Sequence, residues 1–189
     1  MKRTLINYLG LLGMVSLLSY TAAVIFSPLA YPDYHWLSQA VSDLSAEAAS
    51  SRTLWNQLSA LYMPCGIVCC TVNCIAVAGK YNKMLRLGVY LFALMNWVTA
   101  VGYAMFPLTD AGTPNGFQNI MHLVVTGAVV ALSILALVLM ICGGCFQRQC
   151  RSLGFWAGAA LFLMILGAVG VNLLPRAYFG LAERFSTFA

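Results

Sequence analysis

Charged residues are scarce in this chain of 189 residues. Only 8% of the residues are Asp, Glu, Lys or Arg, and only five of them are acidic. A soluble domain carries about a quarter charged residues, and a nucleic-acid-binding surface needs a basic face in water. The composition therefore argues against both classes. With 61% hydrophobic residues and a mean hydropathy of +0.84, the expected solvent is the lipid bilayer.

The chain also lacks the alternating apolar and polar pattern of membrane strands. It contains instead five continuous apolar stretches near the roughly 20 residues that a helix needs to cross the hydrocarbon. These stretches cover approximately residues 5–26, 58–78, 87–106, 117–141 and 153–174. The first is not followed by a small-x-small cleavage site and is predicted to stay as a membrane anchor. We predict an all-α polytopic bundle, one integral membrane domain over residues 1–189.

Acidic residues are absent from alternate loops. One side of the predicted membrane carries seven basic residues and no acid, namely Lys2, Arg3, Lys80, Lys83, Arg86, Arg148 and Arg151. The other side carries three basic residues, Arg52, Arg176 and Arg184, and every acid, Asp33, Asp43, Glu47, Asp110 and Glu183. The positive-inside rule places the basic side in the cytoplasm. In a cell membrane the N-terminus is then predicted to be cytoplasmic and the C-terminus to lie outside.

Two segments on the acidic side show helical periodicity. In residues 33–48 the apolar positions are Leu37, Ala40, Val41, Leu44 and Ala48, and in the tail they are Tyr178, Leu181, Ala182, Phe185 and Phe188. Apolar residues at this spacing predict two amphipathic helices on the outer face. We expect the first to pack across the ends of the spans, so that Asp43 approaches the start of the fourth span near Gln118 and His122.

Motifs for a metal centre or a cofactor are lacking. The two histidines do not form an H-x-x-x-H pair, and no strand-linked Gly-rich loop or nucleophile elbow is present. We therefore predict no metal and no cofactor. Polar residues near a membrane interior are costly and mark functional sites. The candidate ligand-binding residues on the acidic side are His35, Asp43, Asp110, Gln118, His122, Glu183 and Arg184.

These residues leave three functions open. The first is a protein with an outward-facing polar pocket that binds or carries a lipid headgroup or a small polar solute. The second is an intramembrane acid-base or metal-dependent enzyme acting on a lipid-like substrate, with Asp43, Asp110 and His122 in the catalytic roles. The third is a structural membrane subunit without a ligand. The expected partners are membrane lipids rather than nucleic acid, and the sequence does not indicate an oligomeric state.

Four short motifs occur in a fixed order. "WLSQAVSDLSA" follows the first stretch, "FPLTD" closes the third, "NIMHL" opens the fourth, and "GLAERF" stands near the end. This order resembles the multi-pass membrane proteins catalogued as domain of unknown function 998, over nearly the whole chain. The resemblance implies a helical membrane protein without an established reaction. Members usually have six spans, the last of them after the "GLAERF" equivalent. This chain stops at Ala189, so we expect the sixth span to be missing.

Overall fold

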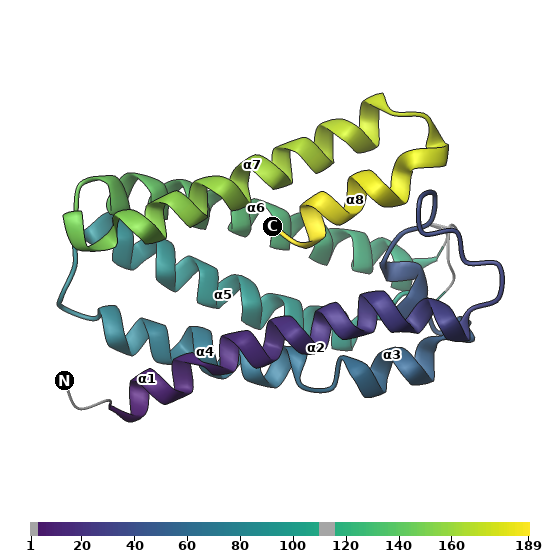
Figure 1. The fold of residues 1–189 in the computed structure, drawn as a ribbon, viewed down its shortest axis with the longest axis horizontal. Coiled ribbons are helices and arrows are strands. Elements are labelled where there is room, and N and C mark those ends of the chain that lie inside the picture. The colour runs from purple at the N-terminus through teal and green to yellow at the C-terminus, as the bar shows by residue number, and fades with distance from the viewer. Residues whose placement is uncertain (1–3, 110–115) are drawn as a thin grey trace.

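Long helices dominate the computed structural model, which describes residues 4–109 and 116–189 (Figure 1). Within these ranges the α-helices are α1 (Leu5–Gly10), α2 (Leu12–Phe26), α3 (Arg52–Leu58), α4 (Tyr62–Val77), α5 (Lys83–Met105), α6 (Phe117–Cys145), α7 (Arg151–Leu173) and α8 (Phe179–Thr187). The 3₁₀ turns are η1 (Ser27–Ala30), η2 (Ser42–Ser45), η3 (Arg148–Cys150) and η4 (Arg176–Tyr178). Five segments are long and apolar enough to cross a membrane. The predicted all-α membrane bundle is confirmed.

The helix boundaries follow the predicted spans except in the first two. The first span is interrupted at Leu11, between α1 and α2. The second begins earlier than predicted, because α3 precedes α4 and a turn separates them. Pro64 accounts for this turn, since it has no amide to donate to the carbonyl four residues earlier, at Ala60. Pro64 instead lies in the first turn of α4, where no intrahelical donor is needed.

The spans pack as a row in chain order. Helix α2 packs against α4, α4 against α5, α5 against α6, and α6 against α7. The α5–α6 contact is the tightest, because Gly143 of α6 leaves room for the backbone of Leu85 and Gly102 of α5 leaves room for Val125. The two outer members of the row, α2 and α7, are bridged by α8. This helix packs on α7, and its Phe188 ring lies 5.8 Å from the ring of Tyr20 in α2.

The connection between α2 and α3 and the connection between α7 and α8 lie at one end of the molecule, which we call the acidic end because Asp33, Asp43 and Glu47 belong to the first of these connections (Figure 1). Residues 31–51, which we call the first loop, enter it from α2, and the α7–α8 connection lies beside them. The predicted helix over residues 33–48 is wrong, because this loop consists of turns with only η2 as regular structure. Its apolar positions are nevertheless used, since Val41 and Leu44 are buried.

The first loop avoids a helix because its polar side chains bind its own backbone. The Gln39 side chain accepts from the His35 amide at 2.6 Å, and the Tyr34 hydroxyl donates to the Ala40 carbonyl at 2.8 Å. Asp33, the first residue of the segment predicted as a helix, has a φ of 62°. This left-handed conformation cannot begin an α-helix.

The tail helix is confirmed, but it does not lie flat across the acidic end. Helix α8 turns back beside α7, and the Ser186 hydroxyl donates to the carbonyl of Met164, near the middle of α7, at 3.1 Å. Gly167 permits this approach, because a Cβ at that position would overlap Ser186. Figure 1 shows α8 between α7 and the α2 layer, with the C-terminus about halfway along the molecule.

Candidate functional site

A depression of about 480 Å³ opens at the acidic end between α2, the first loop and α8. We call it the α2–α8 groove. Most of its lining is apolar, and it includes one charged side chain. The lining residues are Val24, Ile25, Pro28, Tyr34, Trp36, Arg184 and Phe188. The groove thus joins the end of a membrane span to an interfacial loop rich in aromatic residues.

Arg184 fastens α8 to the first loop beside this groove. Its Nη1 donates to the carbonyl oxygens of Trp36 at 2.6 Å and Gly180 at 2.7 Å, and less closely to that of Gln39 at 3.3 Å. Its Nη2 donates to the Tyr34 hydroxyl at 2.8 Å. The guanidinium carbon also lies 5.9 Å and 6.0 Å from the ring centroids of Tyr34 and Trp36, within cation–π range. All of these partners are uncharged.

The neighbours of Arg184 in α8 extend this contact, which we call the α8–loop seam. The Glu183 carboxylate accepts from the Val41 amide at 2.7 Å. The Leu181 amide donates to the Leu37 carbonyl at 3.0 Å. Gly180 meets the loop backbone directly, because a Cβ there would overlap a loop carbonyl oxygen. The seam therefore satisfies loop backbone groups that a helix would have satisfied internally.

Burial changes the acidity of the two carboxyls near the groove. It raises the pKa of Glu183 above its ordinary value, although the Val41 amide and the Arg184 charge lower it in part. Burial also raises the pKa of Asp43, and the Ala40 amide offsets some of this effect. At a given pH these two groups therefore carry less negative charge than solvated carboxylates would.

Asp43 does not meet the fourth span as expected. Its carboxylate accepts from the Ala40 amide at 3.1 Å, inside the first loop. Among the described residues no hydrogen bond joins Asp43 to Gln118 or His122. The electrostatic influence of Asp43 falls instead on Glu183 of the tail. The first loop turns back on itself locally instead of forming the predicted helix, and the Asp43 carboxylate is bonded within this loop.

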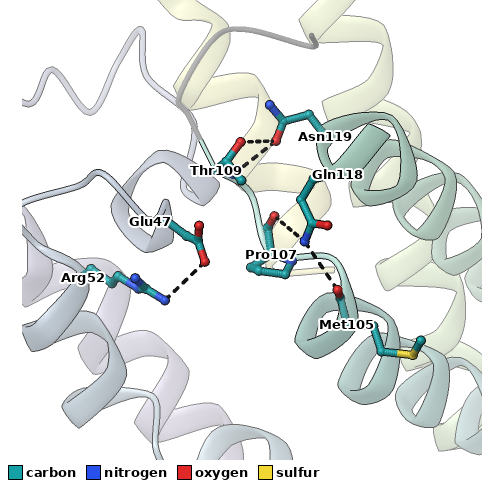
Figure 2. Close-up of polar contacts among 7 residues, drawn as sticks. All are labelled: Glu47, Arg52, Met105, Pro107, Thr109, Gln118 and Asn119. Carbon is teal, nitrogen blue, oxygen red and sulfur yellow. Dashed lines mark hydrogen bonds and ion pairs between the residues drawn. The ribbon is translucent and has the colours of Figure 1, made fainter. Parts of the chain in front are cut away.

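Gln118 and His122 do lie on one face of α6, but they serve the end of α5. The Gln118 side-chain nitrogen donates to the carbonyl oxygens of Met105 at 3.3 Å and Pro107 at 3.5 Å (Figure 2). The His122 Nδ1 donates to the carbonyl oxygen of Phe106 at 2.8 Å. These carbonyls lie at the last residue of α5 or just after it, where no intrahelical donor is available. Both side chains thus have a structural role that the sequence did not reveal.

The connection after α5 forms hydrogen bonds with α6 and with the first loop. The Asn119 side-chain oxygen accepts from the amide of Thr109 at 3.1 Å and from its hydroxyl at 2.9 Å (Figure 2). The Glu47 amide donates to the Leu108 carbonyl at 3.0 Å. Glu47 also forms an exposed ion pair with Arg52 at 3.6 Å, on the opposite side of the close-up from Gln118.

The other candidate residues are dispersed. The His35 side chain is exposed, and Asp110 lies outside the described residues. Glu183 and Arg184 are adjacent in α8 and belong to the seam. Within the described ranges no group of three or more His, Cys, Asp or Glu side chains is placed to hold a metal ion. The structure therefore joins the tail candidates to the first loop, whereas the hydrogen bonds of the Gln118 and His122 side chains run to the end of α5.

Several residues near the groove were not predicted as site residues, and most of them are aromatic. The ring of Tyr20, which packs against that of Phe188, lies 4.6 Å from the ring of Tyr62. Tyr103 lies 4.8 Å from the His122 ring and shares a 3.0 Å hydrogen bond with Thr126. Tyrosines near the ends of apolar helices are typical of a membrane interface. That pattern could have indicated the depth of these residues, although not their partners.

The comparison with known proteins gives a family. The sequence pattern of a family described as "Protein of unknown function (DUF998)" matches residues 14–189. The chain belongs to the DUF998 family. This confirms the resemblance carried by the four sequence motifs, and the description of DUF998 names no reaction. No curated protein and no solved structure matches this DUF998 chain.

Proposed function

We propose that this DUF998 protein binds an amphiphile, a membrane lipid or a lipid-like molecule, in the α2–α8 groove. The observation that carries the proposal is the composition of the groove. The apolar residues Val24, Ile25 and Pro28 come from the end of a span, whereas Tyr34 and Trp36 come from an interfacial loop. Ligand sites are mostly apolar hollows with a few placed polar groups. This lining suits a molecule with an apolar body and a polar end better than it suits a small polar solute.

The contacts of the α6 candidates favour binding over acid-base catalysis. Gln118 and His122 each donate to backbone carbonyls at the end of α5, and in the described part of the chain neither of them shares a hydrogen bond with Asp43. A general base must lie within reach of the proton that it removes. A carrier role needs only the groove and a path to the bilayer.

Filling the groove tests the proposal. Ile25 lines the groove and is 58% exposed, whereas Leu29, in η1, is 82% exposed and does not line it. We expect protein extracted in mild detergent to retain a lipid, observed by native mass spectrometry. Ile25→Trp should lower the retained fraction, and the matched control Leu29→Trp should not. Equal retention by the two variants, or no retained lipid in the unaltered protein, would support the structural-subunit alternative instead.

A further inference from the structure

We infer that the α2–α8 groove selects an anionic phospholipid, with Arg184 as the residue that recognises the headgroup phosphate. This inference rests on the proposed function and adds the chemical class of the ligand. It depends on the unused donors and uncompensated charge of one side chain, and on the place of that side chain among apolar residues.

The guanidinium of Arg184 has donors to spare. It carries five N–H bonds in a fixed plane. Its Nη1 is occupied by carbonyl oxygens, and its Nη2 has one acceptor, the Tyr34 hydroxyl. Within the described ranges, no acceptor is bound to Nε or to the second N–H of Nη2. A pair of phosphate oxygens matches the bidentate geometry of a guanidinium, as a carboxylate also does.

The charge of Arg184 is also weakly compensated. The described part of the chain gives it no ion pair within 4.0 Å, since its hydrogen-bond partners are all neutral. The titratable groups that interact electrostatically with Arg184 are Tyr20, Tyr34 and Glu183, and burial raises the pKa of the Glu183 carboxyl above its ordinary value. The groove therefore complements a negative group, and Arg184 is the one charged residue in its lining.

The apolar lining identifies the source of that negative group. Val24, Ile25 and Phe188 would contact hydrocarbon, and they have no function toward a free phosphate ion. A lipid whose acyl-glycerol part contacts these residues has its phosphate at the level of Trp36. Tryptophan residues at a membrane interface lie at this headgroup level. A net anionic headgroup is preferred to a zwitterionic one, because the ammonium of the zwitterion opposes Arg184.

Trp36 provides the readout, because it lines the groove and is 53% exposed. The protein is reconstituted in phosphatidylcholine vesicles with increasing fractions of brominated phosphatidylglycerol, brominated phosphatidylcholine or brominated diacylglycerol. Bromine quenches tryptophan fluorescence on contact, and subtracting the Trp36→Phe signal isolates Trp36. We expect half-quenching at a roughly fivefold lower fraction of phosphatidylglycerol than of phosphatidylcholine, the effect of one basic residue on an anionic lipid. Diacylglycerol should quench least.

Two variants assign the preference. Arg184→Gln should abolish the difference between the two phospholipids, whereas Arg176→Gln, an exposed arginine at the same end, should retain it. Arg184→Lys, which keeps the charge, should retain part of it and controls for a loosened tail.

Three outcomes would overturn the inference. Equal quenching of Trp36 by both phospholipids would refute the anion preference while leaving lipid binding intact. Displacement of brominated phosphatidylglycerol by millimolar inorganic phosphate would show a site for free phosphate. Absence of Trp36 quenching by any lipid would refute the proposed function as well.

Discussion

At the residue scale, the tail owes its position to a few side chains that bind backbone rather than one another. Glu183 and Arg184 carry opposite charges, but their hydrogen bonds go to the first loop and, within α8, to Gly180. This arrangement explains why the loop is ordered without a helix. It also means that single substitutions in α8 should have effects on residues about 140 positions away in sequence.

Glu183 should make stability depend on pH. Burial raises its pKa in the folded protein above the ordinary 4.5, so the folded state holds this proton more tightly than the unfolded state does. The free energy of unfolding should then fall as pH rises from about 4.5 through the raised value. Glu183→Gln keeps an acceptor for the Val41 amide and removes the charge. Thermal midpoints in detergent, measured between about pH 4 and pH 7, should therefore vary less in this variant.

The exposed Glu47 supplies the control for this measurement. Glu47→Gln, which removes an exposed carboxylate at the same end, is the matched variant for the loss of one negative charge. Asp43, whose pKa burial also raises, accounts for the slope expected to remain in Glu183→Gln. If the thermal midpoint depends on pH equally in Glu183→Gln and in the unaltered protein, ionisation of Glu183 does not change the free energy of unfolding.

Gly180 should tolerate no side chain. A Cβ there would overlap the Gln39 carbonyl oxygen and lie 2.7 Å from that of Trp36. We expect Gly180→Ala to lower stability by about 1–3 kcal/mol, the range for overpacking, because the seam must open to admit the methyl group. Gly158→Ala, in the middle of α7 with open space around it, is the matched control and should be neutral or slightly stabilising. Similar denaturation midpoints for the two variants would contradict this account.

At the scale of elements, hydropathy determines where the membrane spans lie, whereas contacts with distant parts of the chain determine the conformation of the first loop. The spans could be predicted because each apolar stretch must satisfy its own backbone in lipid, and only a helix does so. The helix predicted over residues 33–48 is wrong because its amides and carbonyls are bound by Asp43, Gln39 and the tail. Periodicity within one segment carries no information about a partner on another helix. For the same reason, the sequence marks His122 as a candidate site residue and does not indicate that its ring donates to the Phe106 carbonyl.

The α5–α6 pair offers an element-scale prediction at Asn82. Its side chain accepts from the Leu85 amide at 2.8 Å, capping α5, and donates to the Gly143 carbonyl of α6 at 2.8 Å. Asn82→Ala should lower stability by about 1–2 kcal/mol through the lost cap alone, and by more if the bond between helices contributes. Asn82→Asp keeps the capping acceptor and loses the donor. In a denaturant titration the loss in Asn82→Asp measures the bond to Gly143, and the additional loss in Asn82→Ala measures the cap. Equal losses in the two variants would assign the whole effect to the bond.

At the scale of the whole molecule, the charge distribution predicts the orientation in the membrane. Short epitope tags inserted at Lys80, between α4 and α5, and at Asp33, in the first loop, should lie on opposite sides. An antibody should reach the tag at Asp33 in intact cells, and the tag at Lys80 only after the membrane is permeabilised. Detection of both tags under the same condition would overturn the topology.

The α8–loop seam also sets an order of events during biosynthesis. Trp36 and Val41 leave the ribosome early, but the groups that bind their backbone, Arg184 and Glu183, follow 148 and 142 residues later. The first loop therefore remains without its contacts to the tail while every later span is being inserted. Until the tail is made, the Trp36 carbonyl and the Val41 amide lack the tail groups that bind them in the folded protein. Maturation of this protein should accordingly show a late step, in which the acidic end becomes resistant to protease only after residues 180–184 have been made.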